Sequence, residues 1–266
     1  MNLIRQEIKM SYRSFISYTL GLVILYTVFL SFFESFRKNA AMLEDILSNF
    51  PPEFKAAFGF SDVDLSQLSG YLSFLFGYIV LIGAIYAMKL GTTLLSEEVR
   101  SKTADFLLTK PITRTTIVTS KLATILFFIG LQNLIFYTVA LLSTILILTD
   151  HVLPLWLFTC MCLSILLVQL FFVGIGMLCA AAFKKIKSVM PITLGVVFIF
   201  YILEMINASV MDPKLAYLTP FSYFKGSRIL ENNGLSATFV LLVLCLFVLF
   251  ICTSYFIYQK KDIGSV

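Results

Sequence analysis

Charged residues are scarce in this sequence. Only 13% of its 266 residues are Asp, Glu, Lys or Arg, whereas an average soluble domain has about 25%. Hydrophobic residues make up 59% of the chain, and the mean hydropathy is +0.94. So few polar side chains cannot cover a protein of this size in water. The composition therefore excludes an ordinary soluble protein and indicates that lipid surrounds most of the chain.

The residues and motifs of common enzymes are also missing. The sequence has one histidine, His151, and no GxxxxGK[ST], HExxH or GxSxG motif. These absences argue against ATP hydrolysis by a phosphate-binding loop, a catalytic zinc site and a Ser/His/Asp hydrolase. The string Glu97-Glu98-Val99-Arg100 resembles part of the motif of CPBP intramembrane proteases, but its spacing is shorter and the further histidines are absent. We expect no catalytic, metal or cofactor site in this chain.

Neither the cysteines nor the net charge indicates a special function. The five cysteines lie in apolar runs without CxxC spacing, which is typical of free packing residues. The net charge of +5 is scattered, so it does not indicate nucleic-acid binding. In a membrane protein such an excess marks cytoplasmic loops and contacts with anionic lipid.

Long apolar runs dominate what is present. A helix needs about 20 apolar residues to cross a bilayer, and lipid cannot form hydrogen bonds with an open backbone. The sequence therefore predicts an all-α integral membrane protein, a single transmembrane domain over 1–266 with six spans. The predicted spans are 16–33, 71–94, 122–148, 155–183, 189–206 and 237–258.

Positive charges predict the orientation. Thirteen Lys and Arg residues fall at the N-terminus, in 95–121, in 184–188 and at the C-terminus, whereas six fall in the two long loops on the other side. Because short cytoplasmic loops are enriched in Lys and Arg, we expect both termini and 95–121 to be cytoplasmic.

The first fifteen residues carry two stripes at helical spacing. One is apolar and the other is basic: Ile4, Ile8 and Tyr12, and Arg5, Lys9 and Arg13. This pattern predicts an N-terminal helix lying in the cytoplasmic interface. The alternative is a frayed basic tail.

The two external segments differ in character. In 34–70, apolar residues recur at helical spacing from Met42 to Phe50 and end at Pro51-Pro52, which predicts a short helix over the membrane domain. In the second segment, 207–236, Pro213, Pro220 and Gly226 interrupt a run of aromatic residues. This segment either folds back at the outer headgroup level or is a plain connector.

Few polar residues lie inside the spans. Lys89 and Glu204 lie near span ends, where Lys89 can extend toward the headgroups and Glu204 can reach water. Three amides can form hydrogen bonds between helices: Gln132, Asn133 and Gln169. No acidic cluster lies at the midplane, as ion-coupled carriers generally require. We therefore expect the energy source to lie outside this chain.

Small residues repeat at four-residue spacing in two spans. They are Gly83, Ala87 and Gly91 in span 2, and Gly176 and Ala180 in span 4. Such seams allow helices to pack closely. We interpret them as packing sites, with a moving helix contact as the functional alternative.

The segment between spans 2 and 3 is the most informative. Glu98 precedes Lys102 by four residues, which favours a helix. Pro111 then breaks it, and Thr113 can cap the helix that enters span 3. The apolar tip, 106–108, is unusual for a solvated loop. It is either a docking site for another protein or an interfacial helix against lipid.

At these residues the chain resembles the permease subunit of ABC-2 type transporters. The matching elements are Glu97-Glu98, Lys102-Thr103, Leu107-Leu108, Pro111-Ile112-Thr113-Arg114 and Lys121, with Lys102 in place of the usual glycine. The layout of an N-terminal helix, six spans and a large first outer loop with Pro51 and a Phe58-Gly59 turn is also similar. The resemblance covers the whole chain, and only 97–121 is specific.

The resemblance implies a function and partners. In that family this segment is a cytoplasmic coupling helix that sits in a groove of a separate ATP-binding subunit. Two permeases, identical or different, and two ATPases form the transporter, with ATP and Mg on the ATPases. Coupling here would involve Glu97, Glu98, Arg100, Thr103, Phe106, Leu107, Leu108, Lys110, Pro111 and Arg114.

We therefore expect a permease for ATP-driven export in a cell membrane, of the bacterial inner-membrane type. The apolar spans favour a hydrophobic or amphipathic cargo such as a peptide, drug or lipid. The alternative is a membrane sensor, immunity or signalling protein without transport of its own.

Overall fold

Six long helices form the body of the protein. The structure is a computed structural model that describes residues 2–60, 64–100, 113–148, 154–183, 186–210, 212 and 214–260. The long helices are α1 (Asn2–Ser31), α5 (Leu68–Arg100), α7 (Arg114–Ile147), α8 (Leu155–Ala182), α9 (Val189–Val210) and α12 (Ala237–Lys260). Within the described residues, six helices are long and apolar enough to cross a membrane. The predicted all-α membrane fold is confirmed.

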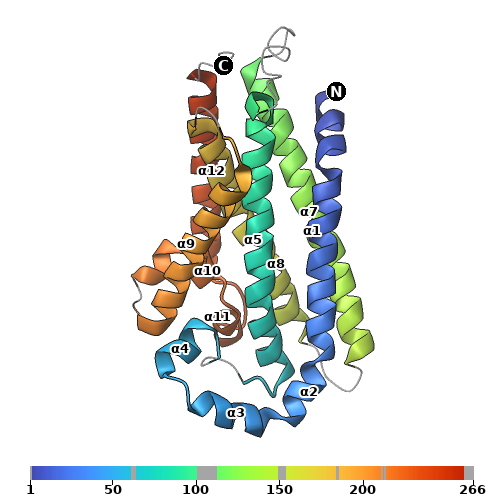
Figure 1. The fold of residues 1–266 in the computed structure, drawn as a ribbon, viewed down its shortest axis with the longest axis vertical. Coiled ribbons are helices and arrows are strands. Elements are labelled where there is room, and N and C mark those ends of the chain that lie inside the picture. The colour runs from blue at the N-terminus through green and yellow to red at the C-terminus, as the bar shows by residue number, and fades with distance from the viewer. Residues whose placement is uncertain are drawn as a thin grey trace.

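The long helices run along one axis, and α5 packs against α8 near the middle (Figure 1). Small residues allow this contact. A Cβ atom on Gly176 would lie 2.7 Å from the Met88 carbonyl oxygen, and one on Gly91 would lie 2.9 Å from the Val173 carbonyl oxygen. Each glycine is therefore required for the close approach of the two backbones, and the predicted packing role of these seams is confirmed.

Amide side chains connect α7 to α8. Asn133 Nδ2 donates to Gln169 Oε1 over 2.6 Å. Gln169 Nε2 in turn donates to Gln132 Oε1 over 2.9 Å. The predicted hydrogen bonds between spans are confirmed; Gln132 and Gln169 are buried, and Asn133 is half-buried.

Helix α1 corrects one prediction. Residues 2–31 form one continuous helix, so a separate N-terminal helix lying in the interface is not present. The helix contains no proline that would break it. The side of α1 that packs against the protein near the N-terminus differs from the apolar stripe. Glu7, Ser11 and Phe15 are buried, whereas Ile4 is 38% and Tyr12 is 41% exposed.

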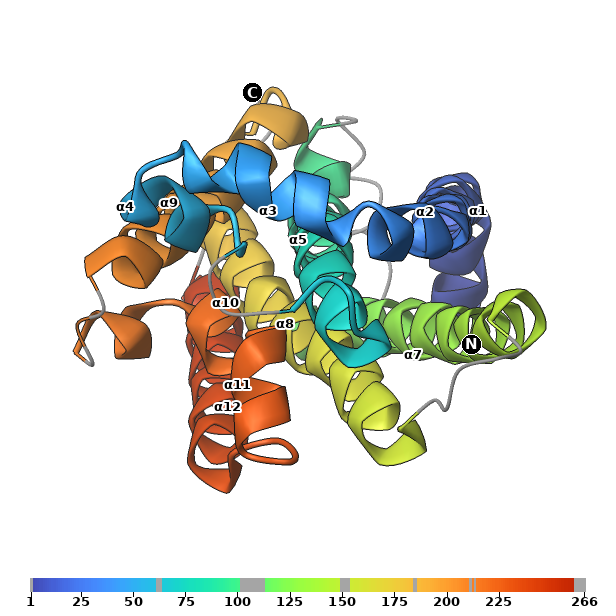
Figure 2. The ribbon, with the colours of Figure 1, turned by 90° about the horizontal axis from the view of Figure 1, so that it is seen from below.

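Three short helices cross one end of the bundle, and we call this end the loop end. They are α2 (Phe33–Lys38), α3 (Ala40–Ser48) and α4 (Pro52–Ala57). Figure 2 shows them as an arc from α1 to α9. The Ser209 hydroxyl donates to the Glu53 carbonyl over 3.0 Å and so holds α4 to α9. Gly59 has a φ of +78° in the turn after α4. The predicted helix, its stop at Pro51-Pro52 and the turn are confirmed.

The segment 207–236, predicted to be external, folds back into the bundle. It contains η1 (Leu215–Leu218), α10 (Pro220–Tyr223) and α11 (Gly226–Glu231). Pro220, Phe221 and Tyr223 are buried. A Cβ atom on Gly226 would lie 2.7 Å from the Ser73 Cα of α5, so α11 lies directly on that helix. The fold-back, and not a plain connector, is the observed arrangement.

The opposite end carries both termini, the end of α5 and the start of α7 (Figure 1). We call it the basic end, because its segments contain most of the Lys and Arg residues. The structure contains no membrane, so its cytoplasmic orientation stays a prediction.

Candidate functional site

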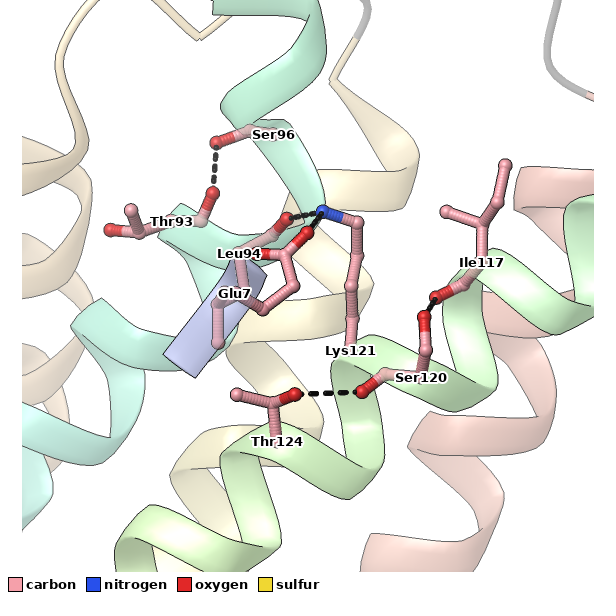
Figure 3. A network of polar contacts seen from close by, with 8 residues as sticks. All are labelled: Glu7, Thr93, Leu94, Ser96, Ile117, Ser120, Lys121 and Thr124. Atoms are coloured by element: carbon pink, nitrogen blue, oxygen red, sulfur yellow. Dashed lines mark hydrogen bonds and ion pairs between the residues drawn. The ribbon is translucent and has the colours of Figure 1, made fainter. Parts of the chain in front are cut away.

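A buried lysine joins three helices at the basic end. Lys121, on α7, has a side chain that is 0% exposed. Its Nζ donates to Glu7 Oε1 on α1 over 3.0 Å and also to the carbonyl oxygen of Leu94 on α5 (Figure 3). The three groups meet where no water reaches the ammonium. We refer to this contact as the lysine junction.

Breaking the ion pair of the lysine junction lowers the stability of the fold. The Glu7 side chain is 8% exposed, so both charges of the pair are shielded from water. Removing one member of a buried ion pair leaves the other charge uncompensated, which costs about 3–5 kcal/mol. The junction therefore fixes α1, α5 and α7 relative to one another.

The junction joins the two helices that flank residues 101–112 in the sequence. Leu94 lies six residues before the end of α5, and Lys121 lies seven residues after the start of α7. Each distance is about two helical turns. A displacement of this segment would therefore act on helices that are joined to each other close to its base.

The start of α7 also contacts the end of α12. Arg114 donates to the carbonyl oxygens of Gln259, over 3.1 Å, and Tyr258, over 3.4 Å. A cation is stabilised by the last carbonyls of a helix. The hydroxyls of Thr119 and Tyr255 lie 2.8 Å apart in a second contact between the same helices. The basic end thus joins four helices.

The predicted cap of α7 is confirmed. The Thr113 hydroxyl accepts from the Thr116 backbone N–H over 3.3 Å, and the helix begins at Arg114. This cap satisfies one of the free N–H groups at the helix start. It fixes the start of α7 at Arg114.

Comparison with known protein families identifies the chain. The family model for the "ABC-2 family transporter protein" matches residues 1–263. The chain belongs to the ABC-2 transporter family. It is a permease of an ABC transporter and a multi-pass membrane protein, and the family implies pairing with an ABC ATP-binding subunit. A search of curated proteins finds no match.

The structure places only part of the predicted coupling set of this ABC-2 permease. Glu97 lies in the last turn of α5, and Arg114 begins α7 beside α12. For Glu98 and Arg100 the backbone alone is described, as part of α5. The remaining positions lie outside the described residues: Thr103, Phe106, Leu107, Leu108, Lys110 and Pro111. The coupling role of the whole set stays a prediction.

Sequence reasoning missed Glu7. Lys121 was identified by its place in the motif, but its acidic partner on α1 was not. One signal was available, because Glu7 is the only acidic residue in the first 33 positions. A lone acid among basic residues, on the face shared with Phe15, indicates a paired side chain.

Among the residues that the structure describes, no group of three or more His, Cys, Asp or Glu side chains could hold a metal ion. That this chain binds no nucleotide or metal itself stays an expectation from its sequence.

Proposed function

We propose that this ABC-2 permease exports a hydrophobic or amphipathic cargo, driven by a separate ATPase that docks on segment 95–114. Two permeases and two ATPases form the working transporter, and the ATPases bind ATP and Mg. The basic end then faces the cytoplasm of a bacterial cell, in the inner membrane.

The lysine junction is the observation that carries this proposal. A coupling element is effective only if the helices that it pushes are joined to one another. Lys121 provides that joint through Glu7 on α1 and Leu94 on α5. Since α5 also packs tightly on α8 through Gly91 and Gly176, a push on the end of α5 moves several helices together.

The surface of α9 supports an apolar cargo. Its exposed side includes Phe198, Ile199, Ile202 and Ile206. In the proposed transporter this side faces lipid or the second permease, and the pathway lies between two copies of α5 and α9.

Co-purification with the ATPase tests the docking. We expect the paired changes Leu107→Asp and Leu108→Asp to remove the ATPase from tagged permease, because charged side chains cannot enter an apolar groove. Met42→Asp, an exposed apolar position at the loop end, is the matched control and leaves the complex intact. A complex that survives the paired changes contradicts the docking proposal.

Transport itself is tested in inverted vesicles that contain both subunits. We expect cargo uptake only with ATP. The absence of any ATP-dependent uptake, with the ATPase bound, would favour the sensor alternative.

A further inference from the structure

A buried carboxylate lies at the loop end. Glu204, on α9, is 9% exposed. Its Oε2 accepts a hydrogen bond from the Ser222 hydroxyl of the fold-back segment. Ionisable groups buried among membrane spans are expensive and are by default candidates for function. Family membership assigns no role to this one.

Glu204 borders an apolar chamber. The cavity has a volume of about 90 Å³ and is lined by residues of α4, α5, α8, α9 and the fold-back segment. Its wall includes the aromatic side chains of Phe58, Phe74, Tyr78, Tyr201, Phe221 and Phe224. The volume is of the same order as the roughly 150 Å³ apolar cavity that accepts benzene in a well-studied protein. The chamber therefore suits one ring or a short alkyl group.

A polar vestibule adjoins this chamber. It has a volume of about 410 Å³ and shares Glu204, Ala208, Lys225 and Ser227 with the chamber. Three carboxylates line the vestibule, those of Glu204, Asp212 and Glu231, together with the basic side chains of Lys225 and Arg228. The guanidinium of Arg228 lies 5.2 Å from the centre of the Phe239 ring, so part of its charge is engaged there.

A buried hydrogen-bond acceptor in the vestibule has no donor among the described residues. Asn207 is 8% exposed, and its Nδ2 donates to the Ser222 hydroxyl over 2.8 Å. Its carbonyl oxygen, Oδ1, has no hydrogen-bond partner among the described residues. A buried polar atom of this kind is costly unless a ligand or water satisfies it. The unsatisfied atom is an acceptor, so the missing group is a donor.

We propose that the chamber and the vestibule together bind an amphipathic organic cation, an ammonium group that carries one aromatic or short alkyl group. The ammonium donates to Glu204 and to Asn207 Oδ1, and the apolar group enters the chamber. The aromatic wall stabilises a cation beside it through the ring faces. A neutral alcohol of the same shape can still donate one hydrogen bond, but it lacks the positive charge that Glu204 and the ring faces stabilise.

The binding of two matched probes to the purified full chain tests the proposal. The probes are 4-phenylbutylamine and the neutral 4-phenylbutanol, measured by calorimetry in detergent with micelles alone as the blank. We expect the amine to bind more tightly than the alcohol. Glu204→Gln keeps a hydrogen-bond partner for Ser222. We expect it to lower the affinity for the amine by about tenfold or more and to leave the affinity for the alcohol unchanged.

Two further variants control the test. Glu34→Gln removes an exposed carboxylate at the same end and leaves amine binding unchanged. Ala208→Phe obstructs the junction of the two cavities and abolishes the binding of both probes, which keeps the test valid even where Glu204→Gln fails to fold. Equal binding of amine and alcohol, or amine binding that survives both Glu204→Gln and Ala208→Phe, overturns the proposal. No ATPase is present, so the outcome is independent of the proposed coupling.

Discussion

The two ends of this permease bury charge in different ways. At the basic end, the ammonium of Lys121 meets the carboxylate of Glu7 and a backbone carbonyl. At the loop end, the carboxylate of Glu204 meets the neutral hydroxyl of Ser222 and faces two adjoining cavities. A buried charge with an ionic partner serves as a joint between helices. The Glu204 carboxylate also has the cationic side chains of Lys225 and Arg228 nearby, but because it borders a cavity it is within reach of a ligand.

The largest expected effect tests whether the lysine junction holds the helices together. We expect Lys121→Met to lower the free energy of unfolding by about 3–5 kcal/mol, because Glu7 then stays buried without its cation. Chemical unfolding in mixed micelles measures it. Adding Glu7→Leu to the same chain restores most of the loss, since no charge remains buried.

Lys9→Met is the control for this change, because Lys9 lies on the exposed side of α1 near Glu7. We expect it to alter stability little. If Lys121→Met is no more harmful than Lys9→Met, the lysine junction is not a structural joint.

A smaller effect tests the close contact between α5 and α8. Gly176→Val would place its Cβ atom 2.7 Å from the Met88 carbonyl oxygen, and such overpacking costs about 1–3 kcal/mol. Gly21→Val is the matched control, since nothing lies within 4 Å of a Cβ atom there. The same unfolding assay compares them, and equal stability of the two variants would show that α5 and α8 are not in close contact.

The smallest effect concerns the amides between α7 and α8. A double-mutant cycle with Asn133→Leu and Gln169→Leu is expected to give a coupling energy of about 0.6 kcal/mol, typical of a hydrogen bond between spans. If the effects of the two single changes on the free energy of unfolding simply add, the 2.6 Å hydrogen bond between Asn133 and Gln169 contributes nothing to stability.

Much of this fold could be predicted from the sequence, and the failures have one physical cause. Span positions follow from the length of apolar runs, and the glycine seams and the Thr113 cap follow from local chemistry. Hydrophobicity does not distinguish a face that meets lipid from one that meets protein. The stripe at Ile4 and Tyr12 suggested a separate interfacial helix, because nothing in its spacing shows that the helix continues into span 1 or that Glu7 lies on the packed face.

The candidate site was predictable only in part for the same reason. Lys121 and Arg114 belong to a motif, so their neighbourhood could be inferred. The partners of Lys121 come from α1 and α5, and only tertiary packing brings them together. Glu204 was expected near water, but the fold-back segment covers it, and no local pattern in α9 indicates that cover.

The central claim is that the lysine junction is the cytoplasmic base of the coupling segment. Side-specific labelling tests it directly, with a membrane-impermeant maleimide and a chain whose five cysteines are replaced by serine. Thr115→Cys, exposed on α7 at the basic end, and Met42→Cys, exposed on α3 at the loop end, are the two reporters. We expect Thr115→Cys to react only in inverted vesicles and Met42→Cys only in intact cells. The reverse pattern would contradict the account, because no cytoplasmic ATPase could then reach the basic end.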